Sequence, residues 1–161
     1  MLAFDIDGRR FQVRAGALLR HQGRWLLHRA PADAYWSLPG GRVDPGETAA
    51  QTVVRELQEE LGVAATAGPL RVLVENFFAL GHRPFHELNL VVEAHLPDGH
   101  PLLTMEGDFA GDEAGSPLVF RWFAAEDLPG LDIRPQALQQ LVAAPDSPFL
   151  HLVQQDRHTP A

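Results

Sequence analysis

The feature that most constrains this chain is a run of three glutamates, Glu56, Glu59 and Glu60, in a segment patterned as a helix. Residues three and four apart share one face of a helix, and like charges at that spacing destabilise it. A divalent cation among the carboxylates would offset this repulsion, and oxygen ligands alone suit hard ions such as Mg²⁺ or Mn²⁺. We therefore expect a helix that holds a metal site, and we keep a solvated acidic surface as the alternative.

The limits of this helix follow from the residues around the glutamates. Apolar residues recur at three- and four-residue steps and form one face, namely Ala50, Val53, Val54, Leu57 and Leu61. Thr48 and Gln51 fit a capping box, and Gly62 takes the place of a C-terminal helix glycine. The preceding segment, residues 38–47 (LPGGRVDPGE), is rich in glycine and proline and predicts a shaped loop, not a regular element.

Segments typical of strands surround the helix. Asp7-Gly8 is a strong hairpin signal between two of them, and a second turn, HQGR, separates another pair. A second helix is expected over residues 134–144, and the tail from about residue 145 is weakly patterned. Strands are expected at residues 2–6, 10–20, 25–30, 71–80, 86–96 and 118–124. This order predicts an α/β fold with helices packed on one mixed sheet, in a single domain over residues 1–161.

Composition excludes several classes of function. The formal net charge of −8 argues against a general nucleic-acid-binding surface, which needs a basic footprint, although local arginines or a cation can still receive an anionic substrate. The chain has no cysteine, so disulfides and thiolate zinc sites are excluded and the cytoplasm is the expected compartment. No apolar run approaches the roughly 18 residues that a membrane span needs, and no signal peptide is expected.

A longer motif contains the glutamate helix. Between Gly41 and Val63 the order is Gly, five residues, Glu, seven residues, then Arg-Glu-aliphatic-any-Glu-Glu-any-Gly-aliphatic, with every fixed position filled. This spacing resembles the Nudix box, the signature of the Nudix (MutT-like) hydrolases, and the preceding WSLPGG resembles its usual lead-in. The resemblance implies an α/β/α sandwich that hydrolyses a nucleoside diphosphate linked to another group, with Mg²⁺ or Mn²⁺ bound at the box glutamates.

The resemblance also implies roles for the box residues. Glu56, Glu59 and Glu60 would be metal ligands, and the backbone carbonyl of Gly41 would be another. Glu47 and Arg55 would hold the geometry of the ligands. The metal would neutralise the pyrophosphate, activate a water for attack on phosphorus and stabilise the leaving oxygen.

Four further residues are candidates for substrate binding. Arg29 and Arg42 would contact phosphates, with surface arginines as the alternative interpretation. Trp36 could stack on a base, although core packing is the commoner role of an aromatic residue. Glu106 is chosen from an acidic loop as an extra carboxylate, with a solvated loop as the alternative. The other carboxylates of that loop are Asp108, Asp112 and Glu113.

These observations predict a Mg²⁺-dependent pyrophosphohydrolase that acts on a small-molecule nucleoside diphosphate derivative. Nucleotide sugars, ADP-ribose, dinucleoside polyphosphates and oxidised nucleoside triphosphates all remain open, because the box recognises pyrophosphate and metal only. The alternative is a catalytically silent Nudix domain that binds or senses a nucleotide. No polymeric nucleic acid and no membrane is expected as a partner, and both a monomer and a homodimer are compatible with the sequence.

Overall fold

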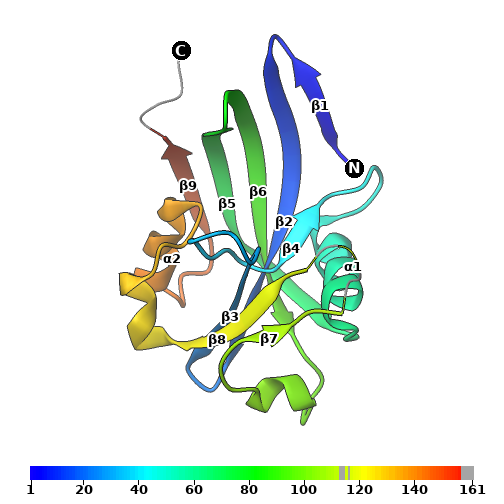
Figure 1. The fold of residues 1–161 in the computed structure, drawn as a ribbon, viewed down its shortest axis with the longest axis vertical. Helices are drawn as coiled ribbons and strands as arrows, with labels where there is room; N and C mark the ends of the chain where they lie inside the picture. Colours follow the sequence, from blue (N-terminus) through cyan, green and yellow to red (C-terminus); the bar gives the residue numbers. More distant parts are fainter. Residues whose placement is uncertain (113–114, 116, 157–161) are drawn as a thin grey trace.

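A computed structural model describes residues 1–112, 115 and 117–156, which form a mixed β-sheet with helices on opposite sides (Figure 1). The helix α1 (Ala49–Leu61) lies against one face, and α2 (Gln139–Ala143) lies against the other. The strand order is β7 (Phe109–Ala110), β8 (Val119–Ala124), β3 (Arg24–Arg29), β2 (Arg9–His21), β6 (Arg83–His95), β5 (Thr66–Leu80), β9 (Leu150–Gln155). The predicted α/β architecture is confirmed, because the pairs β2–β6 and β5–β9 are parallel and the others along this order are antiparallel.

Two tight turns set the register of the first strands. Strand β1 (Ala3–Ile6) pairs with β2 across Asp7-Gly8, and β2 pairs with β3 across Gln22-Gly23. All four turn residues have positive φ, between 48° and 74°. This conformation matches the right-handed twist of two paired strands, and glycine adopts it without steric cost. The hairpin predicted at Asp7-Gly8 is therefore confirmed.

Helix α1 begins and ends where its capping residues predict. The Thr48 hydroxyl accepts from the backbone N–H of Gln51, and the Gln51 side chain accepts from the backbone N–H of Thr48. Gly62 ends the helix in the left-handed conformation, with φ of 65°. Val53 and Leu57 are fully buried against the sheet. This packing fixes the rotation of the helix about its axis, and hence the direction of its glutamate face.

The expectation that residues 38–47 contain no regular element was wrong. Gly40–Arg42 forms a short strand, β4, that pairs with β2 opposite residues 14–16. Gly40 has φ of 148°, and a Cβ there would collide with the backbone carbonyl of Ala15. Only glycine permits this close approach of two backbones. A strand of this length is specified by backbone contact, which hydrophobic periodicity does not report.

The C-terminal part is more ordered than its pattern suggested. The helix expected over residues 134–144 is present as a short 3₁₀ turn, Gln136–Leu138, followed by α2. Beyond it, β9 pairs in parallel with β5, and Leu152 of β9 is buried. Two further 3₁₀ turns, Pro101–Thr104 and Ala125–Gly130, flank β7 and β8 in the chain. In the described part of the chain, no helix is long and apolar enough to cross a membrane.

We expect Thr48→Ala to lower the free energy of unfolding by about 1 kcal/mol, because it removes the oxygen that satisfies a helix N–H group. Urea denaturation followed by far-UV circular dichroism measures this change. Thr48→Ser keeps the hydroxyl and serves as the matched control, with a midpoint close to that of the wild type. Equal midpoints for the alanine and serine variants would contradict a stabilising role of the cap.

Candidate active site

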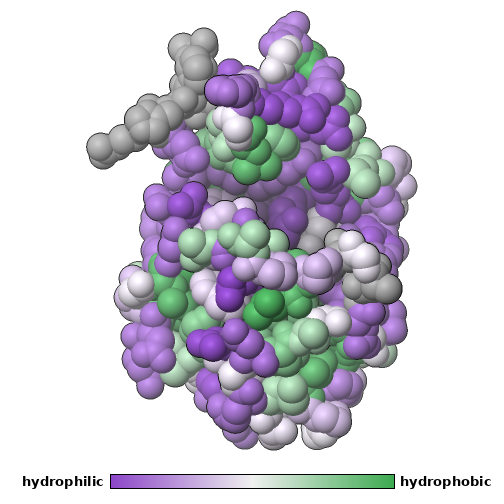
Figure 2. Space-filling view, viewed as in Figure 1, coloured by the Kyte–Doolittle hydropathy of each residue, from purple (hydrophilic) through white to green (hydrophobic). Residues whose placement is uncertain are grey.

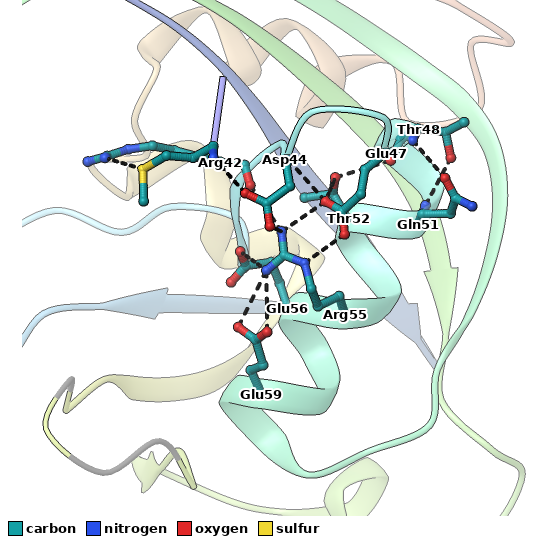
Figure 3. Close-up of polar contacts among 10 residues, drawn as sticks. Arg42, Asp44, Glu47, Thr48, Gln51, Thr52, Arg55, Glu56 and Glu59 are labelled. Carbon is teal, nitrogen blue, oxygen red and sulfur yellow. Dashed lines mark hydrogen bonds and ion pairs between the residues drawn. The ribbon is translucent and has the colours of Figure 1, made fainter. Parts of the chain in front are cut away.

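Arg55 of α1 joins the glycine-rich loop to the helix (Figure 3). Its Nε and Nη2 atoms donate to the two carboxylate oxygens of Glu47 at 2.8 and 3.0 Å. Its Nη1 atom donates to Glu56 at 2.8 Å and to Glu59 at 3.4 Å. Its Nη2 atom also donates to the backbone carbonyl of Arg42 at 3.1 Å. One guanidinium group therefore holds the loop against the helix and places a positive charge between the carboxylates.

The three box glutamates differ strongly in their exposure to solvent. The side chain of Glu59 is 47% exposed, that of Glu56 is 14% exposed, and that of Glu60 is 5% exposed. This gradient follows from the rotation of α1, because Glu60 is closest to the buried stripe that contains Leu57. The glutamate face thus runs from solvent to the interior, and the alternative of a fully solvated acidic surface is not supported.

Glu56 lies directly against the backbone of Gly41. A Cβ on residue 41 would overlap the Glu56 carboxylate, so the space that a side chain would fill belongs to this glutamate. Burial raises the pKa of the Glu56 carboxyl, while its hydrogen bond and ion pair with Arg55 act in the opposite direction. The structure therefore brings the Glu56 carboxylate and the Gly41 backbone together, and their part as metal ligands stays a prediction.

Glu60 approaches a histidine that the sequence did not single out. The Nδ1 atom of His28 is 3.7 Å from Oε2 of Glu60, and both side chains are buried. Burial lowers the pKa of the His28 imidazole to about 3, with a smaller contribution from the nearby Arg14. His28 is therefore neutral at pH 7, and its ring packs against Phe120 at a centroid distance of 5.5 Å. It lies beside Glu60 without supplying a positive charge.

The donors of the box residues are carboxylate oxygens beside the backbone of Gly41, and this chemistry fits a hard divalent cation. The contact of Glu56 with Gly41 supports this fit, because it keeps a carboxylate and a carbonyl-bearing segment side by side. The side chains of Glu56 and Glu59 are turned towards Arg55. Accordingly, no group of three or more His, Asp or Glu side chains among the described residues is arranged to hold a metal ion.

A cavity of about 490 Å³ opens beside Glu60. It runs from the β4 loop across one face of β2, β6 and β5 to the chain around residues 134–138, and the end of β9 also lines it. Figure 2 shows a hollow near the middle of this side of the molecule, with hydrophilic residues at its bottom. Four arginines line the cavity, namely Arg14, Arg29, Arg42 and Arg134. Four carboxylates also line it, those of Asp33, Glu60, Glu87 and Asp156, so basic and acidic side chains share the cavity.

Two of the four predicted substrate residues reach this cavity. Arg29 and Arg42 line it, whereas Trp36 and Glu106 do not. Trp36 instead packs edge-on against Phe123 at a centroid distance of 4.8 Å, so the core-packing alternative describes it better. The Arg29 guanidinium lies over the Trp36 ring, 5.1 Å from its centroid. Trp36 therefore supports a cavity arginine and does not itself face the cavity.

Glu106 does not line the cavity, and its exposed side chain pairs with Arg24 at 3.3 Å. Arg24 begins β3, whereas Arg29 ends the same strand at the cavity. Of the other acidic residues in this loop, Asp112 is at the end of α1, where its backbone N–H donates to the Glu60 carbonyl at 2.7 Å. Glu113 lies outside the described residues. The acidic loop thus contacts the end of the glutamate helix through a different residue from the one chosen.

Sequence reasoning missed the polar residues that line the cavity from inside the strands, namely Gln12, Arg14, Asn76 and Asn89. They alternate with apolar residues, which is also the pattern of a strand with one face in solvent. The available signal was chemical: amides are depleted in strands, and here they recur on three of them. Periodicity alone does not distinguish a solvated face from the wall of a cavity.

The contact of Arg55 with Glu47 predicts a specific pH dependence of stability. Hydrogen bonding from Arg55 lowers the pKa of the Glu47 carboxyl from 4.5 to about 2. The unfolded chain binds this proton more readily, so the stabilisation is complete above about pH 4.5 and is lost as the pH falls towards 2. Glu47→Gln should lower the free energy of unfolding at neutral pH, by about 1 kcal/mol or less for a partly exposed pair.

Urea unfolding at a series of pH values tests this expectation. The difference between the wild type and Glu47→Gln should stay constant from neutral pH down to about pH 5 and shrink below that value. Glu126→Gln changes an exposed carboxyl outside the site and serves as the control. A difference that does not change with pH would contradict the assignment of the low pKa to Glu47.

Comparison with known proteins gives a consistent family assignment. The family model described as the NUDIX domain matches residues 10–144. A CTP pyrophosphohydrolase of Escherichia coli is 43% identical over 56 residues, which are 32% of this chain and 42% of that protein. An 8-oxo-dGTP diphosphatase of the same organism is 37% identical over 59 residues, 34% of this chain and 46% of that protein. The chain therefore matches less than half the length of each of these two relatives.

Solved structures extend the similarity to most of the fold. A NUDIX hydrolase from Nitrosomonas europaea aligns with a TM-score of 0.62 at 20% identity, over 90% of this chain and 79% of that chain. An ADP-ribose pyrophosphatase from Streptococcus suis aligns with a TM-score of 0.59 at 21% identity, over 88% of this chain and 98% of that chain. Because the family model covers well over half of its length, this protein belongs to the Nudix family.

Proposed function

We propose that this protein hydrolyses the pyrophosphate linkage of a nucleoside diphosphate derivative with the help of Mg²⁺ or Mn²⁺. The observation that carries the proposal is a complete box whose most buried glutamate, Glu60, lines a cavity that four arginines also line. A box carboxylate and several arginines in one cavity suit a substrate whose phosphates bridge a cation and arginine side chains.

The arginines have separate tasks in this proposal. Arg14 and Arg42 lie on the paired strands β2 and β4, beside Gly41 and Glu56, and would receive the phosphates. Arg14 is held in place because its Nη2 atom donates to the backbone carbonyl of Gly40 at 3.2 Å. Arg55 already contacts Glu47, Glu56 and Glu59, so it would position the carboxylates and not bind the substrate.

The proposed cation ligands are the carboxylates of Glu56, Glu59 and Glu60, together with the Gly41 carbonyl. A divalent cation held by these residues would supply neutralisation of phosphate charge and a water of lowered pKa that would be the nucleophile for attack on phosphorus. The chain itself supplies a buried carboxylate at Glu60, a backbone fixed by strand pairing at Gly41 and a positive charge at Arg55. Preorganised charges of this kind stabilise the transition state more in a shielded cavity than in water.

The substrate class is consistent with the names of related proteins. Those relatives are described as acting on CTP and on 8-oxo-dGTP, and a similar structure is described as an ADP-ribose pyrophosphatase. These compounds share a nucleoside joined to two or more phosphates. We infer that this chain acts on a small molecule of that class, through the phosphates that the box and the arginines receive.

We expect Glu60→Gln to lower kcat by at least about 100-fold on any substrate that the wild type hydrolyses, because a proposed cation ligand loses its charge. Turnover is measured as phosphate or pyrophosphate release from CTP, 8-oxo-dGTP, ADP-ribose and a nucleotide sugar, with Mg²⁺ or Mn²⁺ and with EDTA. Circular dichroism and the melting temperature check that the variant is folded.

Glu126→Gln is the matched control and should retain wild-type turnover, because this glutamate is exposed and outside the cavity. Full activity of Glu60→Gln, or activity that EDTA does not reduce, would overturn the metal assignment. Nucleotide binding without turnover of any compound would instead identify a catalytically silent binding domain.

A further inference from the structure

A buried carboxylate surrounded by amides lies in the wall of the cavity, on the sheet and outside the box. Glu87 of β6 accepts from Nε2 of Gln12 at 2.5 Å and from Nδ2 of Asn76 at 3.1 Å. It also accepts from Nδ2 of Asn89 at 3.5 Å. All four side chains line the cavity, and each is at most 7% exposed. We call these four residues the amide cluster.

Glu87 fixes the orientation of the amides around it. An ionised carboxylate only accepts hydrogen bonds, so each amide must present its NH₂ group to Glu87. Reversing Gln12 or Asn89 would place a carbonyl oxygen against a carboxylate oxygen. The amide oxygens of two of these side chains, Gln12 Oε1 and Asn89 Oδ1, point away from Glu87 as a result. Both oxygens are buried, and neither has a hydrogen-bond partner within the described residues. Buried acceptors of this kind are rare, and leaving them without a donor is unfavourable.

An apolar wall lies next to the amide cluster on the same face of the sheet. Asn76 is opposite Glu87 in the pairing of β5 with β6, and Phe78 is opposite Phe85 two residues further along. The two phenylalanine rings are stacked, with centroids 4.8 Å apart and planes 13° apart, and both line the cavity. A flat apolar surface beside buried polar atoms suits a planar heterocycle that has a hydrogen-bonding edge.

The two unpartnered atoms are acceptors, so they select a ligand that donates. We propose that the amide cluster binds the exocyclic amine of a nucleobase, and that the protein therefore prefers amino-bearing bases to their carbonyl-bearing counterparts. This inference rests on the proposed function, because it assumes that the ligand is a nucleotide. A carbonyl in place of the amine would face Gln12 Oε1 and Asn89 Oδ1, and Glu87 prevents either amide from reversing to meet it.

Matched nucleotides that differ at this edge of the base provide the test. Cytosine differs from uracil, and adenine from hypoxanthine, by the replacement of the exocyclic amine with a carbonyl, and the adjacent ring nitrogen changes with it from an acceptor to an N–H donor. We would measure binding of their α,β-methylene nucleoside diphosphates by titration calorimetry in the presence of Mg²⁺. Their bridging carbon resists hydrolysis, so the result does not depend on turnover. The amine-bearing compound of at least one pair should bind at least tenfold more tightly, as expected when a buried acceptor loses its donor.

Variants of the cluster test the source of the preference. Glu87→Gln keeps the shape of the side chain but replaces one acceptor with a donor, so an amide is free to reverse. The preference should fall below threefold, because a reversed amide donates to the carbonyl and raises the affinity for the carbonyl-bearing compound. Glu75→Gln is the matched control on β5, where an exposed glutamate pairs with His151, and it should keep the wild-type preference.

Three results would overturn the inference. They are a wild-type preference below tenfold in both pairs, no binding of any of the four compounds, and an unchanged preference in Glu87→Gln. If Glu87→Gln does not fold, Asn89→Leu removes one of the two acceptors and should reduce the same ratio, and an unchanged ratio would count against the inference. Absence of turnover together with a clear amine preference would overturn the proposed hydrolysis and leave this inference intact.

Discussion

The contacts of Arg55 are the constraint on which the acidic part of this molecule depends. Carboxylates at three- and four-residue spacing repel one another, and a guanidinium group between them supplies the chain's own counter-charge. The same guanidinium group donates hydrogen bonds to both carboxylate oxygens of Glu47, and these bonds fix the end of the loop that contains β4. Because β4 pairs with β2, the orientation of α1 and the position of the cavity arginines are linked through one side chain.

Helix α1 and its surroundings could be predicted in detail from the sequence, because each of its determinants is local. Thr48 and Gln51 are three residues apart, Gly62 follows the last apolar residue, and the box has fixed spacing. The Asp7-Gly8 hairpin is local in the same sense. Roles for Arg55 and Glu47 followed from the family resemblance, and the structure places both residues in mutual contact.

The remaining features depend on contacts between distant parts of the chain. Strand β4 exists because Gly40 tolerates the backbone of Ala15, and β9 exists because β5 offers an edge. The position of Glu106 depended on where Arg24 lies, which no motif reports. The amide cluster draws Gln12 from β2 and Asn76 from β5, so no short window of sequence contains it. Such sites become visible only once the strands are placed side by side.

Strand β9 contributes to the lining of the cavity but not to the box. It follows the part of the chain that matches the family, yet Gln154 lines the cavity and accepts from the backbone N–H of Ala137 at 2.7 Å. One part of the cavity wall is therefore encoded about 90 residues beyond the box, at Gln154 as against Glu60. Exchange of the terminal strand offers a route to new ligand preference, in evolution or in the laboratory, that leaves the box untouched.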